Sequence, residues 1–141
     1  MPNALPLAAT RTVTVVSLAS LAALHVAWAA GSSWPAADRA ALADAIGGFS
    51  DVPGPIACGA VAALLALAAA CVAGRPQTVA PLARAGSGVV AFVLSARGAA
   101  GIAGVMPHDR RSARFAALNR RVYSPICIAL GLASLAGLAR R

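Results

Sequence analysis

The sequence predicts an all-α fold, a polytopic membrane protein built as a bundle of four transmembrane helices in a single domain, residues 1–141. Hydrophobic residues make up 60% of the chain and charged residues only 11%, whereas a soluble domain carries about 25% charge. The apolar residues are gathered in four long runs. Each run approaches the ~20 residues that a helix needs to cross a ~30 Å hydrocarbon core.

The four runs are bounded by prolines, glycines or arginines and lie at about residues 12–31, 55–74, 85–106 and 122–139. No water is available inside a bilayer to satisfy backbone groups, so segments of this length are expected to be helical. Helices are therefore expected in all four runs.

Two connecting segments have the composition of short helices at the membrane surface. Residues 36–46 follow Pro35, which suits the first turn of a helix. Residues 110–120 place arginines around Phe115 and Leu118, as in an interfacial helix with its apolar side towards the lipid. A solvated charged loop is the alternative for the second segment.

The charge of the chain indicates a lipid bilayer as its partner. The formal net charge is +8, from 12 basic residues, all arginine, against 4 aspartates. The arginines lie between the apolar runs, where cations meet anionic headgroups and set topology. No helix-turn-helix or basic-aromatic pattern appears, so a nucleic-acid partner is excluded.

These features predict a multi-pass protein of the cell membrane, in a bacterium the plasma membrane. The loop after the first run is acidic, which favours a cytoplasmic amino terminus. Residues 27–29 imitate a signal-peptide cleavage site, but the apolar run before them is longer than the core of a signal peptide. We therefore expect the first helix to be retained, with cleavage as the alternative.

Arg97 is the most unusual residue, because it lies near the middle of the third run. An arginine at the centre of a membrane helix costs at least about 2.5–3.5 kcal/mol. No acidic residue occurs within any run, so its partner must be a carbonyl, a side-chain dipole, water, a lipid phosphate or an aspartate at the membrane edge. Arg97 is thus either a structural arginine, bonded within the bundle or extended to the interface, or part of an anion-binding site.

Three further polar residues are expected in the same half of the bilayer as Arg97, namely His25, Asn119 and Tyr123. With Arg97 they form a hypothetical ligand-binding site. For His25 the alternative is a hydrogen-bonded packing residue. Trp28, one turn after His25, is expected to anchor the first helix at the interface.

Cys58 and Cys127 are expected at a similar depth and form a candidate redox pair, with His25 as its acid–base group. The alternative is that they pack as small apolar residues. The two histidines and three cysteines show no zinc spacing, so no metal site is expected. No cofactor motif or catalytic constellation is present.

Small residues line the third run at spacings of three and four, among them Ser87, Ala91, Ser95, Gly98 and Gly101. Such faces allow helix backbones to approach closely. Packing within the chain is the favoured use, and a homodimer interface is the alternative.

The chain resembles a bacterial membrane family described as domain of unknown function 3995. Residues 114–127 read RFAALNRRVYSPIC, similar to the family's Phe-Ala-x-x-Asp-x-x-x-Tyr-Ser-Pro-Leu-Cys signature. His25, Trp28 and Trp34 match its first helix, and Arg97 lies where the family has an arginine. The resemblance implies a four-helix membrane fold and no established activity. Asn119 replaces the family's aspartate, and residues 100 and 101 lack the aspartate that typically follows the arginine.

The sequence thus favours a small, non-enzymatic membrane protein that binds a lipid or small ligand, or an accessory subunit of a larger membrane complex. A membrane redox protein or enzyme using Cys58, Cys127 and His25 is one alternative. A minimal transporter is another, although no acid within the runs is available to couple ions.

Overall fold

The described residues of the chain form helices and no strands. The computed structural model describes residues 7–73, 80–105 and 112–138. Its elements are, in chain order, α1 (Leu7–Ala29), α2 (Arg39–Gly47), α3 (Pro55–Ala73), α4 (Ala80–Ala103), α5 (Ala113–Leu118), the π-helical turn η3 (Asn119–Tyr123) and α6 (Ser124–Leu138). The prediction of an all-helical chain is confirmed.

Three of the described helices, α1, α3 and α4, are long and apolar enough to cross a membrane. Their outer faces carry large apolar side chains: Ile56 is 88% exposed, Leu82 73% and Phe92 74%. Side chains of this kind are stable on a helix surface when lipid rather than water surrounds it. The three spans indicate a multi-pass membrane protein.

The first and third apolar helices begin earlier than expected. α1 begins at Leu7 and ends at Ala29, before Gly31, which has a φ of +97°. α4 begins at Ala80 rather than near residue 85. Hydropathy locates only the apolar part of a helix. Turns that extend the helix beyond this part are not detected, so the predicted start of both helices is too late.

The short helix α2 begins at Arg39, three residues later than expected, because Asp38 caps it. The Asp38 carboxylate accepts a hydrogen bond from the backbone N–H of Ala41 at 2.8 Å, which satisfies one of the free donors of the first turn. Gly48 ends α2 with a φ of +61° and donates to the Asp44 carbonyl at 2.9 Å. A left-handed glycine after the last turn is a common end of a helix.

The last apolar helix is longer than the sequence suggests. Ser112 caps α5 through a hydrogen bond from the Phe115 N–H to its hydroxyl, 3.3 Å. α5, η3 and α6 then follow without a break, and the residues at both junctions have right-handed helical dihedrals. The described part of the predicted helix at 110–120 is therefore the start of this helix, and residues 110 and 111 lie outside the described residues.

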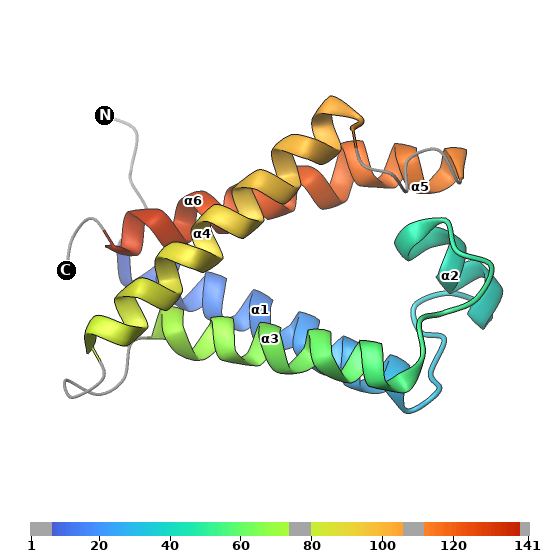
Figure 1. Ribbon diagram of the computed structural model, residues 1–141, viewed down its shortest axis with the longest axis horizontal. Coiled ribbons are helices and arrows are strands. Elements are labelled where there is room, and N and C mark those ends of the chain that lie inside the picture. The colour runs from blue at the N-terminus through green and yellow to red at the C-terminus, as the bar shows by residue number, and fades with distance from the viewer. Residues whose placement is uncertain (1–6, 74–79, 106–111, 139–141) are drawn as a thin grey trace.

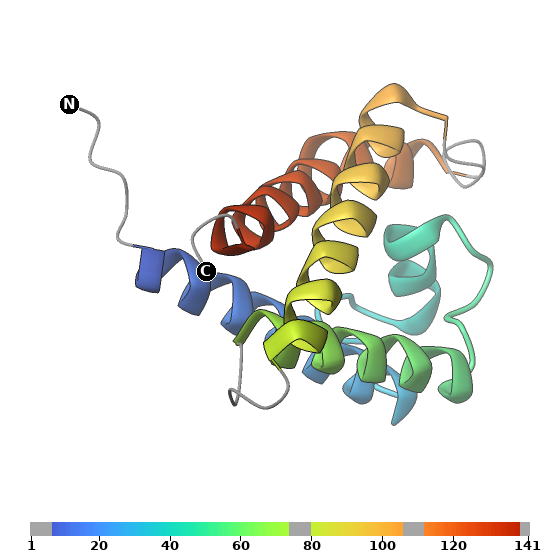
Figure 2. The same cartoon turned by 60° about the vertical axis from the view of Figure 1, so that its left-hand side comes forward.

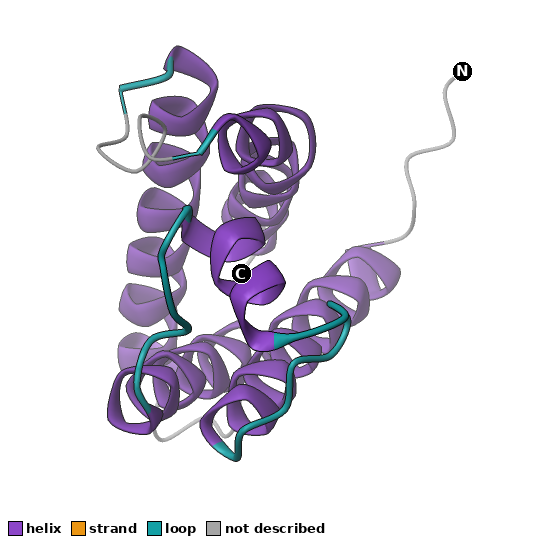
Figure 3. Ribbon diagram, turned by 90° about the vertical axis from the view of Figure 1, so that its right-hand side faces the viewer, coloured by secondary structure: helices purple, strands orange, loops and turns teal. Residues whose placement is uncertain are grey.

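The helices form two hairpins, α1 with α3 and α4 with α6. Figures 1 and 2 show that the hairpins meet where α3 leads towards α4 and diverge towards α2. At the closed end, the Ser87 hydroxyl of α4 lies between two carbonyl acceptors, that of Ala83 in its own helix at 2.8 Å and that of Cys71 in α3 at 3.0 Å. At the open end, α2 lies between the two hairpins (Figure 3).

Small residues allow α4 and α6 to pack with their backbones in contact. A Cβ added at Gly98 would lie 2.5 Å from Ile128 Cγ1 and 2.7 Å from the Ser124 carbonyl oxygen. A Cβ at Gly131 would lie 3.0 Å from the Ala91 carbonyl oxygen. The small residues around Gly98 on α4 therefore pack within the chain, whereas Ala99, on the same helix, is exposed.

Gly98→Ala should lower the free energy of unfolding by about 1–3 kcal/mol, because the new methyl group meets backbone that cannot move aside cheaply. Gly59→Ala on α3 is the matched control: a Cβ there meets nothing within 4 Å, and alanine favours a helix by up to about 1 kcal/mol. Unfolding in micelles titrated with denaturing detergent measures both. Equal effects of the two substitutions would contradict the packing described.

Candidate functional site

The Arg97 guanidinium lies between α4 and the start of the last helix. Its Nη2 donates to Oδ1 of Asn119 at 2.9 Å, and its Nη1 is buried without a hydrogen-bond partner. Asn119 is 0% exposed. A side-chain dipole is thus one partner of Arg97, and protein atoms cover its Nη1.

The π-helical turn η3 brings Asn119 and Ser124 to one side of the helix. The Ser124 N–H bonds to the Asn119 carbonyl, five residues back, and the Ser124 hydroxyl donates to Asn119 Oδ1 at 3.4 Å. In a regular α-helix, residues five apart point about 140° away from each other. The wider turn removes most of that offset, and both side chains are fully buried.

Gly101 of α4 provides the space for this polar cluster, which consists of Arg97, Asn119 and Ser124. A Cβ at Gly101 would collide with the Ser124 hydroxyl and lie 3.0 Å from Arg97 Nη1 and 3.0 Å from Asn119 Nδ2. The glycine therefore lets three polar side chains share one small volume. The sequence did not assign Ser124 or Gly101 to the site: Gly101 was expected only as part of the face of small residues, and Ser124 lies in the Tyr-Ser-Pro segment at residues 123–125.

Tyr123 connects the α4–α6 hairpin to α2. Its hydroxyl donates to the Ala45 carbonyl of α2 at 3.0 Å, and its ring lies 6.3 Å from that of Phe115. Tyr123 is thus next to the polar cluster in sequence but directed to α2, which it holds across the open end of the hairpins.

His25 lies on the other hairpin, in a pocket of its own. Its Nδ1 donates to the Leu21 carbonyl at 2.8 Å, and its ring lies 4.7 Å from that of Trp28. The pocket has a volume of about 270 Å³, and its lining includes His25 and Trp28 of α1, Ile46 and Phe49 at the end of α2, and Cys58 and Val61 of α3. The structure thus brings Arg97 and Asn119 into contact and places His25 in a separate pocket.

Trp28 is not the interfacial anchor that we predicted. It is 7% exposed, within a core cluster that includes Leu42 and Val52, and its Nε1 donates to the Trp34 carbonyl at 2.7 Å. The chain turns back after α1 and covers the indole, which hydropathy could not indicate. Trp34 is 68% exposed and is the tryptophan free to meet the interface.

The candidate redox pair is divided between the hairpins, since Cys58 is on α3 and Cys127 on α6. All three cysteines are free thiols, and the Cys58 thiol donates to the Pro53 carbonyl at 3.2 Å. No observation favours their use as a pair, which stays a prediction. The described residues contain no cluster of three or more metal-ligating side chains.

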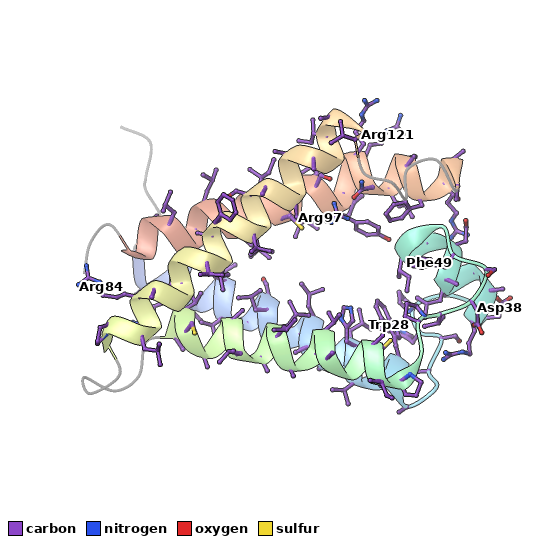
Figure 4. The ribbon with its side chains drawn as sticks, in the orientation of Figure 1. Trp28, Asp38, Phe49, Arg84, Arg97 and Arg121 are labelled. Carbon is purple, nitrogen blue, oxygen red and sulfur yellow. The ribbon has the colours of Figure 1, made fainter. Side chains whose placement is uncertain are left out.

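The side-chain view places these residues relative to the hairpins. Arg97 and Trp28 lie on the inner sides of the two hairpins, whereas Arg84 and Arg121 point outwards at opposite ends of the molecule (Figure 4). The buried guanidinium therefore differs from the outer arginines both in direction and in surroundings.

Residues 18–134 match the model of a protein family described as "Protein of unknown function (DUF3995)". The match covers well over half of the chain, so the protein belongs to this family, as the sequence resemblance predicted. No curated protein and no solved structure matches the chain.

Asn119→Leu should lower the free energy of unfolding by about 1.5–3 kcal/mol, because it removes the acceptor of a charged, buried donor. Asn119→Asp is the matched control: it keeps an acceptor for Arg97 Nη2 and adds an opposite charge. Unfolding in micelles again measures the difference. The account of the cluster is contradicted when both variants are destabilised to the same extent.

Proposed function

We propose that this protein of the DUF3995 family spans the membrane four times and binds the phosphate oxyanion of a ligand, a lipid headgroup or free phosphate, through Arg97. The observation that supports it is the state of the guanidinium: Nη2 is held by a neutral amide and Nη1 is buried without a partner. The function is one of binding, without a chemical step.

Support for the fourth span comes from the pairing of α6 with α4. The contacts of Gly98 with Ile128 and of Gly131 with Ala91 run along both helices. A helix that packs along a transmembrane helix lies at the same depth as that helix. Ile126, Leu132 and Leu135 of α6 are 48–57% exposed, which matches a lipid-facing surface.

Arg97 is placed close enough to the membrane surface to meet a headgroup. It lies six residues before the end of α4 at Ala103, or about 9 Å at ~1.5 Å per residue. We place this end of the bundle opposite the amino terminus and, with that terminus in the cytoplasm, on the outer side of a bacterial plasma membrane. A phosphate that binds the guanidinium is drawn inwards from the headgroup layer along this end of α4.

The positive charge of Arg97 is the main reason to expect an anion beside it. A buried charge without an opposite charge is costly, and Asn119 is neutral. Among the described residues, no carboxylate bonds to Nη1 or Nη2 of Arg97. A planar guanidinium is well suited to the oxygens of a phosphate. Asn119 holds it from one side, and Nη1 can bond the ligand only when the protein atoms that cover it in this structure move aside.

Arg97→Leu should reduce the binding of phosphatidylglycerol at least tenfold, as measured by native mass spectrometry of the protein released from micelles. Arg97→Lys keeps the charge and should retain part of the binding. Arg84→Leu is the matched control, since it removes an exposed arginine from the same helix and should leave the lipid adducts unchanged.

Two further probes identify the source of the phosphate. Diacylglycerol has the same tails without the phosphate and should not replace phosphatidylglycerol. Competition by inorganic phosphate indicates a site for the free anion, and its absence indicates a headgroup site. A folded Arg97→Leu protein with unchanged adducts, or equal binding of diacylglycerol, refutes the proposal.

A further inference from the structure

The pocket beside His25 is chemically different from the polar cluster around Arg97. It is formed by α1, α2 and α3, its walls are mainly apolar, and it includes the rings of Trp28 and Phe49. Ala57 and Val61, which also line it, are exposed on α3, and Val61 is 40% exposed. Because α3 is long and apolar enough to span a membrane, we expect its exposed face, and with it one side of the pocket, to meet lipid.

The polar side-chain atoms of the pocket are occupied, with one exception. Trp28 Nε1 donates to the Trp34 carbonyl, the Cys58 thiol to the Pro53 carbonyl and His25 Nδ1 to the Leu21 carbonyl. A carbonyl can only accept, so the His25 hydrogen is on Nδ1. In a neutral imidazole the other nitrogen, Nε2, is then an acceptor, and no hydrogen bond among the described residues uses it.

We propose that this pocket binds the ring of a membrane-soluble phenol or quinol, whose hydroxyl donates a hydrogen bond to His25 Nε2. An acceptor selects a ligand that brings a donor, and aromatic walls favour a ring through offset or edge-to-face contacts. A volume of about 270 Å³ is just below the ~300–1,000 Å³ of typical small-molecule sites, and it accommodates one substituted ring. The site is distinct from Arg97 and requires neither charge nor phosphate.

The experiment uses the fluorescence of Trp28. The chain has two tryptophans, and Trp34→Phe leaves Trp28 as the sole one while retaining the backbone carbonyl that Trp28 bonds to. Bromine quenches tryptophan fluorescence on contact. In this full-length background, 4-bromophenol should quench Trp28 saturably and bind more tightly than bromobenzene, which lacks the hydroxyl.

His25→Leu should lower the affinity for 4-bromophenol about 3- to 10-fold, the effect of one hydrogen bond, and should leave the affinity for bromobenzene unchanged. His25→Gln offers an amide acceptor and should restore part of the preference. Ala57→Phe fills the pocket and should abolish quenching by both probes, whereas Ala63→Phe, on the exposed face of the same helix and outside the pocket, should not.

Two results overturn the proposal. Equal affinities for 4-bromophenol and bromobenzene in the Trp34→Phe protein show that the pocket accepts any apolar filler, such as an acyl chain. A preference for the phenol that persists in His25→Leu shows that His25 is not the acceptor. Binding of phosphatidylglycerol in His25→Leu serves as the folding control, and its retention also separates this site from that of Arg97.

Discussion

The hydrogen bond from Arg97 to Asn119 is the interaction on which the second half of the chain depends. A guanidinium in an apolar helix must be bonded, and here the acceptor comes from the next helix, 2.9 Å away. That bond requires the close approach of α4 and α6 that Gly98 and Gly101 permit. The bond also depends on the π-helical turn η3, which directs the Asn119 side chain towards α4. The hydrogen bond of this part-buried arginine therefore joins the two helices that pack most closely in this half of the chain.

The sequence predicts the existence and type of the long helices well, because a bilayer imposes a length and a composition on each span. It also predicts Arg97 as the residue that needs a partner and names a side-chain dipole among the candidates. It does not predict that Asn119 is that dipole, since the π-helical turn leaves no mark on hydropathy. Trp28 shows the same limit: its burial comes from the chain that turns back over it after α1.

The two hairpins divide the polar chemistry of the protein. The α4–α6 hairpin carries Arg97 and the α1–α3 hairpin carries His25, and α2 contacts both hairpins. α2 bonds to Tyr123 through the Ala45 carbonyl and contributes Leu42 and Ala43 to the core around Trp28. α2 is thus in contact with both regions. Asn119 gives Arg97 a neutral partner, so its charge has no opposite charge beside it among the described residues.

The most direct test of the central claim is the separation between the Arg97 guanidinium and the phosphorus of a bound phosphate. Solid-state NMR of the protein with labelled arginine in phospholipid vesicles measures it, through dephasing of the guanidinium signal by phosphorus, with Arg97→Lys to assign that signal by difference. The account predicts strong dephasing of the Arg97 signal, as expected for a hydrogen-bonded phosphate. An Arg97 signal without dephasing, in vesicles where the exposed arginines are dephased, would contradict it.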